Sequence, residues 1–197
     1  MLPYSEACVR NQAAILGQLA RLFIVPGHIL EIGSGSGQHA VYFGTHLPHL
    51  VWHTSDLPAY HAGIRAWLDQ AALPNVQPPV TLDVDAPDWA ISALEGVFSA
   101  NTLHIMGWPQ VQGFFAGAAR VLKPDGRLVV YGPFNYGGRF TSDSNRQFDH
   151  SLRQRDPASG IRDFEAVDRL AQQQGLVLLA DHVMPANNRL LVWQHND

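Results

Sequence analysis

Hydrophobic positions follow two alternating patterns along most of the chain. Short apolar runs are separated by longer segments in which apolar residues recur every three or four positions, the spacing of one face of a helix. The longer segments predict helices at 5–23, 37–47, 60–72, 108–122 and 163–174. The short runs predict strands at 28–32, 50–57, 78–84, 96–104 and 127–134. Strands that alternate with helices favour a parallel sheet covered by helices on both faces.

The end of the chain departs from this alternation. Residues 175–184 and 189–195 are two strand-like runs that are joined only by residues 185–188. Because so short a link cannot carry a right-handed crossover, the two strands are expected to be antiparallel neighbours. We therefore predict an α/β fold with a seven-stranded sheet, in which five or six strands are parallel and residues 190–195 run antiparallel within it.

Composition is that of an ordinary globular protein. The 197 residues, 46% hydrophobic and 15% charged, suit a single domain over residues 1–197. The formal net charge of −4 provides no positive field for nucleic acid or an anionic membrane. Cys8 is the only cysteine, so no disulfide can form within the chain. The sequence has neither a signal-peptide pattern nor an apolar run near the ~20 residues of a membrane span, and we expect a cytoplasmic protein.

The stretch ILEIGSGSGQH at 29–39 is the strongest candidate for a binding element, because it places three glycines between a predicted strand and a predicted helix. A hydrolase nucleophile elbow is excluded, since the middle residue of its Gly-x-Ser-x-Gly pattern is Gly35 here. A dinucleotide fingerprint needs a small residue where this chain has Gln38. The spacing of Gly33, Gly35 and Gly37 instead suits a single nucleoside, and a purely structural turn remains an alternative.

Polar residues follow the next three predicted strands. Asp56 ends the second strand, where a carboxylate can accept both hydroxyls of a ribose. Asp83 ends the third, in a position to accept from an adenine amino group or to face water, and Asn101 comes at the carboxyl end of the fourth. Open α/β sheets bind their ligands at the carboxyl ends of the strands, so these residues and the glycine turn together predict a ligand site. Each of them alone is equally consistent with a solvated strand end.

Several longer stretches resemble a known family. LEIGSGSGQHAVYF, Asp56, Asp83 and the terminal hairpin resemble a class I S-adenosylmethionine-dependent methyltransferase with its Rossmann-like fold. Across nearly its whole length the chain is similar to domain-of-unknown-function family 938 (methyltransferase-like protein 26). The stretches that carry this second resemblance are YSEACVRNQAAIL, SANTLHIMGW, VVYGPFNYGGRFTSDSNRQFD, RDPASGIRD and MPANN.

The resemblance implies S-adenosylmethionine as cofactor, with S-adenosylhomocysteine as product. It implies that the turn wraps the methionine portion, that Asp56 holds the ribose, and that Asp83 recognises the adenine beside Val84. Arg10 and Asn11 would lie near the cofactor's carboxylate, although Cys8-Val9 replaces the alanine-glutamate pair that usually precedes this arginine. The cofactor-binding residues predicted in this way are Arg10, Asn11, Glu31, Gly33, Gly35, Gly37, Asp56, Asp83, Val84 and Asn101.

Methyl transfer from a sulfonium is an in-line displacement, so a protein can catalyse it largely by alignment and desolvation. A base is needed only where the acceptor starts protonated, and His104 is the best-placed candidate, with Tyr136 as a second catalytic candidate. The histidines form no cluster with metal-ligand spacing, so no metal is predicted. The segment 101–104 also lacks the Asn/Asp-Pro-Pro-aromatic signature of enzymes that methylate amino groups of bases.

Two regions flank this predicted core. Residues 1–27 contain the N-terminal helix, and residues 133–162 are too long for a plain connection. We predict that 133–162 is an ordered lid insertion whose Tyr136, Arg139 and Asn145 face the substrate, although a salt-bridged surface helix is an alternative.

Three functions remain open from the sequence. The favoured one is a methyltransferase that acts on a small-molecule acceptor. The second is an S-adenosylmethionine-binding protein that has no acceptor of its own and works through a protein partner. A short NAD(P)-dependent oxidoreductase is less favoured because of Gln38 and the terminal hairpin.

Overall fold

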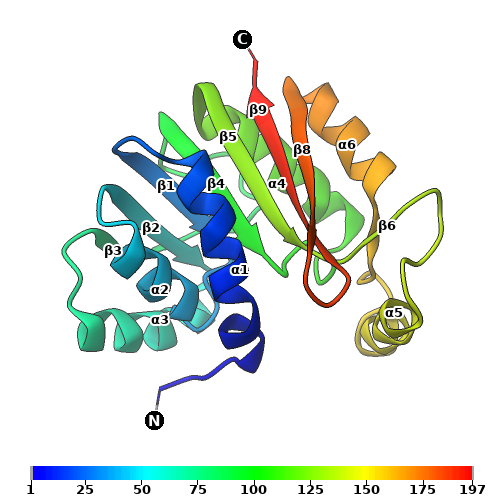
Figure 1. The fold of residues 1–197 in the computed structure, drawn as a ribbon, viewed down its shortest axis with the longest axis horizontal. Helices are drawn as coiled ribbons and strands as arrows, with labels where there is room; N and C mark the ends of the chain where they lie inside the picture. The colour runs from blue at the N-terminus through cyan, green and yellow to red at the C-terminus, as the bar shows by residue number, and fades with distance from the viewer. Residues whose placement is uncertain (1, 197) are drawn as a thin grey trace. The chain divides into compact units, whose positions relative to one another are not determined.

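A seven-stranded sheet organises the protein, as a computed structural model that describes residues 2–196 shows (Figure 1). The strand order is β3-β2-β1-β4-β5-β9-β8, and β9 runs antiparallel to both of its neighbours. The predicted mostly parallel sheet with an antiparallel strand inside it is therefore confirmed. The strands of this sheet are β1 (Gly27–Ile32), β2 (Leu50–Asp56), β3 (Val76–Thr81), β4 (Leu94–Ala100), β5 (Leu122–Gly132), β8 (Leu176–Met184) and β9 (Asn188–His195).

Six helices and a short second sheet complete the described residues. Local sequence signals start several of the helices: the hydroxyl of Ser5 accepts a hydrogen bond from the backbone N–H of Cys8, and that of Ser142 accepts one from Asn145. The helices are α1 (Glu6–Leu22), α2 (Gln38–His46), α3 (Pro58–Ala71), α4 (Trp108–Val121), α5 (Asp143–Arg155) and α6 (Phe164–Gln173). The second sheet pairs β6 (Phe134–Asn135) with β7 (Arg162–Asp163).

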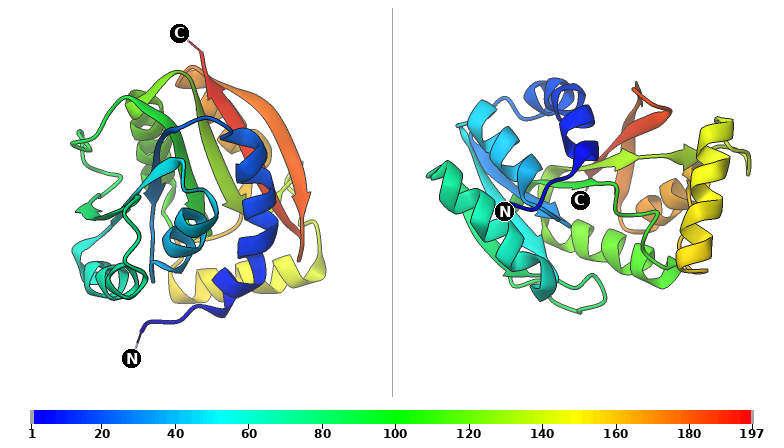
Figure 2. Two further views of the ribbon diagram at one scale, coloured as in Figure 1. Left: turned by 60° about the vertical axis from the view of Figure 1, so that its left-hand side comes forward. Right: turned by 90° about the horizontal axis from the view of Figure 1, so that it is seen from below.

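The chain divides into two compact units, which are described separately. The first contains the chain up to Asp83 together with Leu94–Ser99, and so holds α1, α2, α3 and β1 to β3 with nearly all of β4. Within it, α2 contacts both α1 and α3 (Figure 2). Its core is an aromatic cluster in which the ring of Phe43 lies 5.4 Å from Trp52 and 5.5 Å from Phe98.

The second unit contains Val84–Ala93 and the chain from Ala100 onward. Phe115 of α4 packs edge-on against Trp193 of β9, whose indole N–H donates to Asp168 of α6 at 2.9 Å. Gly117 of α4 lies directly against the ring of Trp89, where no side chain has room. These contacts hold α4 and α6 on β9 and build a core around two tryptophans. The prediction of one domain over residues 1–197 is not tested by this division and stays a prediction.

Three predicted boundaries are corrected by the structure. The fourth strand was expected over 96–104, but β4 ends at Ala100. Asn101 then adopts a left-handed φ of 60°, and the carbonyl of Thr102 accepts from the backbone N–H groups of Ile105 and Met106. This turn takes His104 out of the sheet, because left-handed backbone cannot continue a strand.

The other two corrections concern strand ends. The third strand was expected to include Asp83, but β3 ends at Thr81, so Asp83 follows the strand by two residues. The fifth strand was expected over 127–134, but β5 spans Leu122–Gly132, although its pairing with β9 begins only at Arg127. Asp125 adopts a left-handed φ of 62°, as is usual for an aspartate before glycine in a turn.

Helix α5 forms much of the region 133–162, and the role of this region as a lid stays a prediction. Before the helix, Tyr136 and Arg139 exchange backbone hydrogen bonds of 3.1 and 3.0 Å around a tight turn. Gly137 and Gly138 occupy this turn with φ of 55° and 70°, conformations that glycine adopts without strain. The segment is therefore a strand, a turn and a capped helix rather than an irregular loop.

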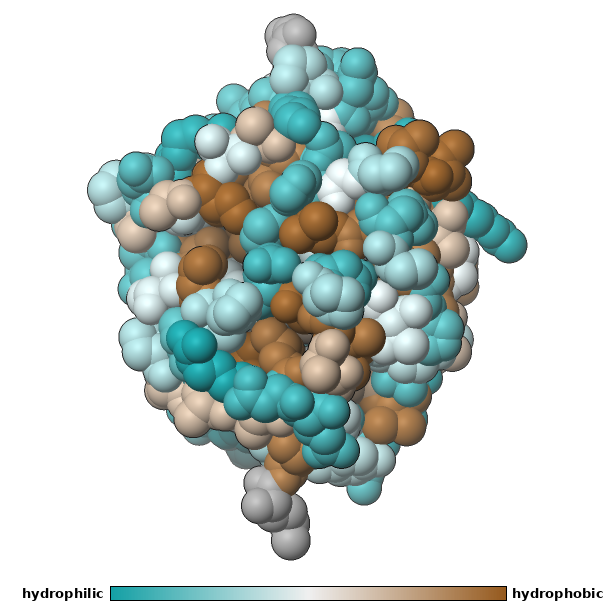
Figure 3. All heavy atoms as spheres, turned by 90° about the vertical axis from the view of Figure 1, so that its left-hand side faces the viewer, coloured by the Kyte–Doolittle hydropathy of each residue, from teal (hydrophilic) through white to brown (hydrophobic). Residues whose placement is uncertain are grey.

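Apolar side chains reach the surface at separate places. In the first unit Leu57, Tyr60 and Val80 are exposed. The side that lies at the left of Figure 1 shows brown apolar atoms in several groups among polar ones (Figure 3). Scattered apolar exposure of this kind is usual for a folded protein. Over residues 2–196, no helix has the length and apolar character that a membrane crossing requires; the cytoplasmic location stays a prediction.

Candidate cofactor and acceptor site

The backbone conformation of the glycine turn requires glycine at three positions. Gly33, Gly35 and Gly37 have φ of 74°, 56° and 88°, all in the left-handed region. Gly37 is also the N-cap of α2, and a Cβ atom there would lie 3.1 Å from the Cα of Ile64. The turn therefore brings bare backbone to the amino end of a helix, an arrangement that suits close approach by a ligand.

The end of β2 holds this turn in place. Oδ2 of Asp56 accepts from the backbone N–H of Gly35, and Oδ1 accepts from that of Leu57, both at 2.8 Å. The carbonyl of Ser55 accepts from Gly33 and Ser34 at 3.1 and 2.9 Å. Burial raises the pKa of Asp56, while the two N–H donors lower it. An ionised carboxylate has about four acceptor positions, so Asp56 retains capacity for the hydroxyls of a ligand.

Glu31 lies beneath the turn on the buried side. Its side chain is 2% exposed and Oε2 accepts from the indole N–H of Trp52 at 3.1 Å. Burial raises the pKa of Glu31 to about 7, against the effect of the Trp52 hydrogen bond. The protonated form of this carboxyl is therefore favoured relative to an exposed glutamate, and a nearby cation would favour the ionised form.

Contacts with α1 reach the same turn. Oε1 of Gln38 accepts from the backbone N–H of Ser5 at 2.5 Å and from the hydroxyl of Ser36 at 3.0 Å. The Nε2 atom of His39 lies 2.7 Å from Oδ1 of Asn11, and burial lowers the pKa of His39 to about 4, so its imidazole is neutral at physiological pH. The sequence analysis did not predict that Gln38 and His39 would bind α1. Their position in the first turn of the helix that follows the glycines could have indicated this role.

Arg10 and Asp83, both predicted to bind the cofactor, lie at the surface. Arg10 pairs with Glu6 one helical turn earlier at 3.0 Å, and both side chains are largely exposed. Asp83 is exposed beyond the end of β3. Neither side chain is committed to the interior, so both are accessible to a ligand.

A pocket of about 470 Å³ adjoins the glycine turn within the first unit. The N-terminal segment forms one wall and is held there by a 2.7 Å hydrogen bond from the indole N–H of Trp67 to the carbonyl of Pro3. The opposite wall is the first turns of α3, immediately after Asp56. The lining residues are Pro3, Tyr4, Gly35, Ser36, Ala59, Tyr60 and Gly63.

In the second unit the structure brings Asn101 and His104 together. Both face Gly132, the last residue of β5: a Cβ atom at Gly132 would lie 3.9 Å from Oδ1 of Asn101 and 3.9 Å from Nδ1 of His104. The backbone N–H of Asn101 also donates to the carbonyl of Tyr131 at 2.8 Å. An amide and an imidazole thus converge at the carboxyl end of β5. Val84, of the same unit, is buried, and its carbonyl lies against Gly113 of α4.

His104 is held as a neutral base. The side chain is 7% exposed, and its ring makes an edge-on contact with Phe148 at 5.2 Å. Burial, and secondarily the positive charge of Arg162, lower the pKa of His104 to about 4. The imidazole is therefore uncharged at physiological pH and can accept a hydrogen bond.

The three predicted lid residues have other surroundings. The hydroxyl of Tyr136 donates to Asp181 at 2.8 Å, and burial together with that carboxylate raises the pKa of the phenol well above its ordinary value. Nδ2 of Asn145 donates to the hydroxyl of Thr141 and to the carbonyl of Asn187. Arg139 is exposed in its tight turn. Protonated Tyr136 is a poor base, and the substrate roles of all three stay predictions.

Across residues 2–196, no group of three or more histidine, cysteine, aspartate or glutamate side chains is arranged to hold a metal ion. His28 and His53 form a pair on adjacent strands, with Nδ1 of His28 2.9 Å from Nε2 of His53.

The fold is that of the class I S-adenosylmethionine-dependent methyltransferases. An O-methyltransferase family protein from Burkholderia thailandensis matches 98% of the chain with a TM-score of 0.85 at 17% identity, and the match covers 58% of that protein. The S-adenosylmethionine-dependent methyltransferase SibL matches 96% with a TM-score of 0.82 at 18% identity, covering 56% of SibL. The chain thus spans little more than half of either structure. A putative methyltransferase from Bacillus halodurans matches 93% of this chain with a TM-score of 0.73 at 14% identity, and the match covers 100% of that protein.

The family is also defined. The model of the family described as "Protein of unknown function (DUF938)" matches residues 2–195, and the chain belongs to this family. The resemblance to a methyltransferase-like member of that family is confirmed. Identities below one fifth carry the fold to this chain but not the substrates or activities of the matched proteins.

Proposed function

We propose that the protein is an S-adenosylmethionine-dependent methyltransferase. The observation that carries the proposal is the glycine turn with Asp56 bound to its tip through Gly35. Three left-handed glycines leave the backbone open, and the carboxylate that holds them keeps acceptor capacity for a ribose. The turn is followed by Gln38, whose side chain anchors α1, so the position that a pyrophosphate would approach is filled.

The donor set fits the cofactor. We assign the ribose to Asp56 and the methionine portion to the glycine turn, with Glu31 near its ammonium group, because a cation offsets the cost of ionising this buried carboxyl. We assign the adenine to Asp83 with Val84. Arg10 and Asn11 would bind the carboxylate of the cofactor. Arg10 would first have to break its ion pair with Glu6, which costs little free energy because the pair is exposed.

The acceptor side rests on Asn101 and His104. When bound, S-adenosylmethionine supplies a methyl group on a sulfonium whose transfer leaves a neutral thioether. Neutral His104 accepts a hydrogen bond from the acceptor's reacting hydroxyl or amine and takes up its proton, while the Asn101 amide orients the acceptor. We further propose that Arg139, exposed in the turn before α5, contacts an anionic part of a small-molecule acceptor.

One observation favours a second candidate, a cofactor-binding protein that works through a protein partner. Ile105 and Trp108, which follow His104, are 56% and 37% exposed, and Phe148 beside its ring is 38% exposed. Exposed apolar side chains around the proposed acceptor position would suit a protein surface.

A labelling experiment separates the two. The purified protein is incubated with methyl-labelled S-adenosylmethionine and either the small-molecule fraction or the protein fraction of a cell extract. We expect label in the small-molecule fraction, and labelling at least ~100-fold slower when His104→Ala replaces the parent chain. Label confined to the protein fraction would contradict a small-molecule acceptor, and absence of label from both fractions would contradict methyltransferase activity and favour the partner-dependent function.

A further inference from the structure

The loop that carries His104 is fixed by one remote segment. Four consecutive backbone carbonyls, from Leu103 to Met106, accept hydrogen bonds from residues 159–162. The backbone N–H of Gly160 donates to the carbonyl of His104 at 2.8 Å, and the hydroxyl of Ser159 donates to that of Ile105 at 3.0 Å. The other two carbonyls are bound by Arg162.

Arg162 spans the loop with its guanidinium group. Its Nε donates to the carbonyl of Leu103 at 3.1 Å, and its Nη2 donates to the carbonyls of Met106 and Ala158. The planar fork of arginine can serve several carbonyls at fixed angles, which the single ammonium of lysine cannot do. One side chain therefore closes both ends of the turn on which His104 lies.

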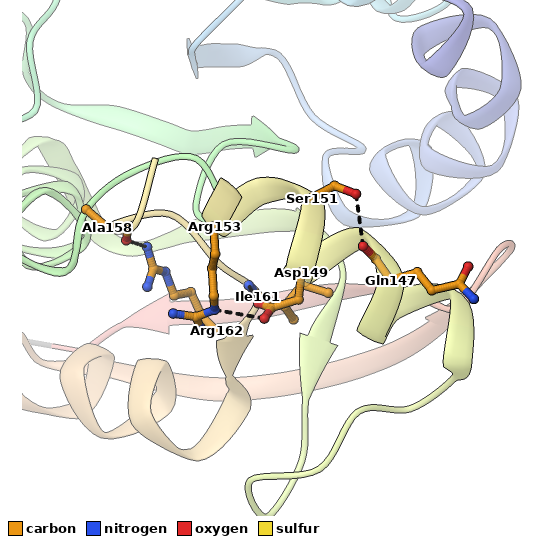
Figure 4. A network of polar contacts seen from close by, with 7 residues as sticks. All are labelled: Gln147, Asp149, Ser151, Arg153, Ala158, Ile161 and Arg162. Carbon is orange, nitrogen blue, oxygen red and sulfur yellow. Dashed lines mark hydrogen bonds and ion pairs between the residues drawn. The ribbon is translucent and has the colours of Figure 1, made fainter. Parts of the chain in front are cut away.

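Helix α5 holds this segment in turn. Asp149, 6% exposed, accepts from the backbone N–H of Ile161 at 2.7 Å and from Nε of Arg153 at 2.8 Å (Figure 4). Its neighbour Phe148 contacts the ring of His104. The same turn of α5 thus supports the Arg162 segment and packs against the imidazole directly.

We propose that Arg162 is the positioning residue for His104: it fixes the Leu103–Met106 loop so that the imidazole faces Asn101 at the end of β5. The proposal rests on the proposed function, in which His104 takes the acceptor's proton. The loop follows a strand of the parallel sheet at the end where ligands bind, and its carbonyls have no partners from regular secondary structure. Arg162 supplies the rigidity that a base needs to meet its acceptor within hydrogen-bond range.

The test uses the cofactor-free protein, so that it does not depend on methyl transfer. Arg162→Lys keeps the charge and loses the fork, Arg162→Gln loses both, and Arg146→Gln removes an exposed arginine of α5 as a matched control. The His104 ring is titrated by NMR, with its signal assigned from His104→Gln, and exchange of the Gly160 amide with solvent is followed in each variant.

In Arg162→Lys we expect the Gly160 amide to exchange at least ~10-fold faster than in the parent chain, while amides of β5 keep their rates. In Arg162→Gln the pKa of His104 should rise from about 4 toward 6.5, because the imidazole loses a positively charged neighbour and becomes more accessible to water. The control should match the parent chain. If Arg162→Gln does not fold, Arg162→Lys decides alone.

Unchanged Gly160 exchange in folded Arg162→Lys, or the same change in Arg146→Gln, would overturn the proposal. Once an acceptor is known, the positioning role also predicts a lower kcat for Arg162→Lys with an unchanged KM for the cofactor. If the protein transfers no methyl group but the variants show the expected NMR and exchange changes, the proposed function is contradicted. The structural part of this inference, that Arg162 fixes the Leu103–Met106 loop, would still hold.

Discussion

Replacing His104 with alanine is expected to lower kcat at least ~100-fold, the usual contribution of a positioned general base. The imidazole is buried, neutral and directed with Asn101 at the end of β5, so its loss removes the proton acceptor that we assign to the reaction. Affinity for S-adenosylhomocysteine should change little, because His104 has no assigned role in holding the cofactor. Steady-state kinetics and calorimetry on the same preparation measure the two effects separately.

The pH dependence gives an independent check. Because burial and Arg162 lower the pKa of His104 to about 4, the base form is present throughout the neutral range and is lost only as pH falls through that value. We expect kcat/KM to stay level down to about pH 5 as far as His104 is concerned, and to fall below it. His104→Gln keeps a polar side chain without the base and is the matched variant. Parent-like kcat in either variant would remove His104 from the mechanism.

Local patterns in the sequence were sufficient for most of the fold. Apolar periodicity located every strand of the large sheet, and the four-residue link at 185–188 required an antiparallel hairpin. The boundary at Asn101 was missed because Leu103 and His104 are buried and continue an apolar pattern. That turn depends on Arg162, about sixty residues further along the chain, and single-sequence reasoning has no access to such a contact.

Helix α5 was predictable in part. Ser142 is a typical N-cap, Asp143 follows in the first turn, and arginines occupy the last turn, as expected from the helix dipole. Its polar composition nevertheless left a lid that faces the substrate and a salt-bridged surface helix as the two alternatives. The buried Asp149 that ties it to Ile161 could not be distinguished by sequence from the exposed acids around it.

The sequence could predict those parts of the candidate site that lie within a single short motif. The glycine turn and Asp56 lie where a strand–turn–helix unit requires them. The acceptor role of Tyr136 stays a prediction, but sequence did not reveal that its hydroxyl donates to Asp181 of β8, which also pairs with Arg189 at 2.7 Å. The cost of leaving buried polar groups unpaired selects such contacts, and they involve residues too distant in sequence for a motif to reveal.

Asp56→Ala is expected to weaken binding of S-adenosylhomocysteine by about ten- to hundredfold. The variant loses a charged acceptor for the ribose, worth about 1.5–3 kcal/mol. It also frees the backbone N–H groups of Gly35 and Leu57, so the turn becomes less well ordered before the ligand arrives. Asp69→Ala, an exposed aspartate on α3 of the same unit, is the matched control and should bind as the parent chain does. Thermal unfolding of each variant separates lost binding from lost structure.

The central claim is that this glycine turn binds S-adenosylmethionine, and isothermal titration calorimetry with S-adenosylhomocysteine tests it most directly. We expect saturable binding to the parent chain and to Asp69→Ala, an affinity for Asp56→Ala that is weaker by about ten- to hundredfold, and no binding of NAD. Equal affinity for the parent chain and Asp56→Ala would make Asp56 a structural strand end. Absence of binding to the parent chain, or binding of NAD in its place, would contradict the account.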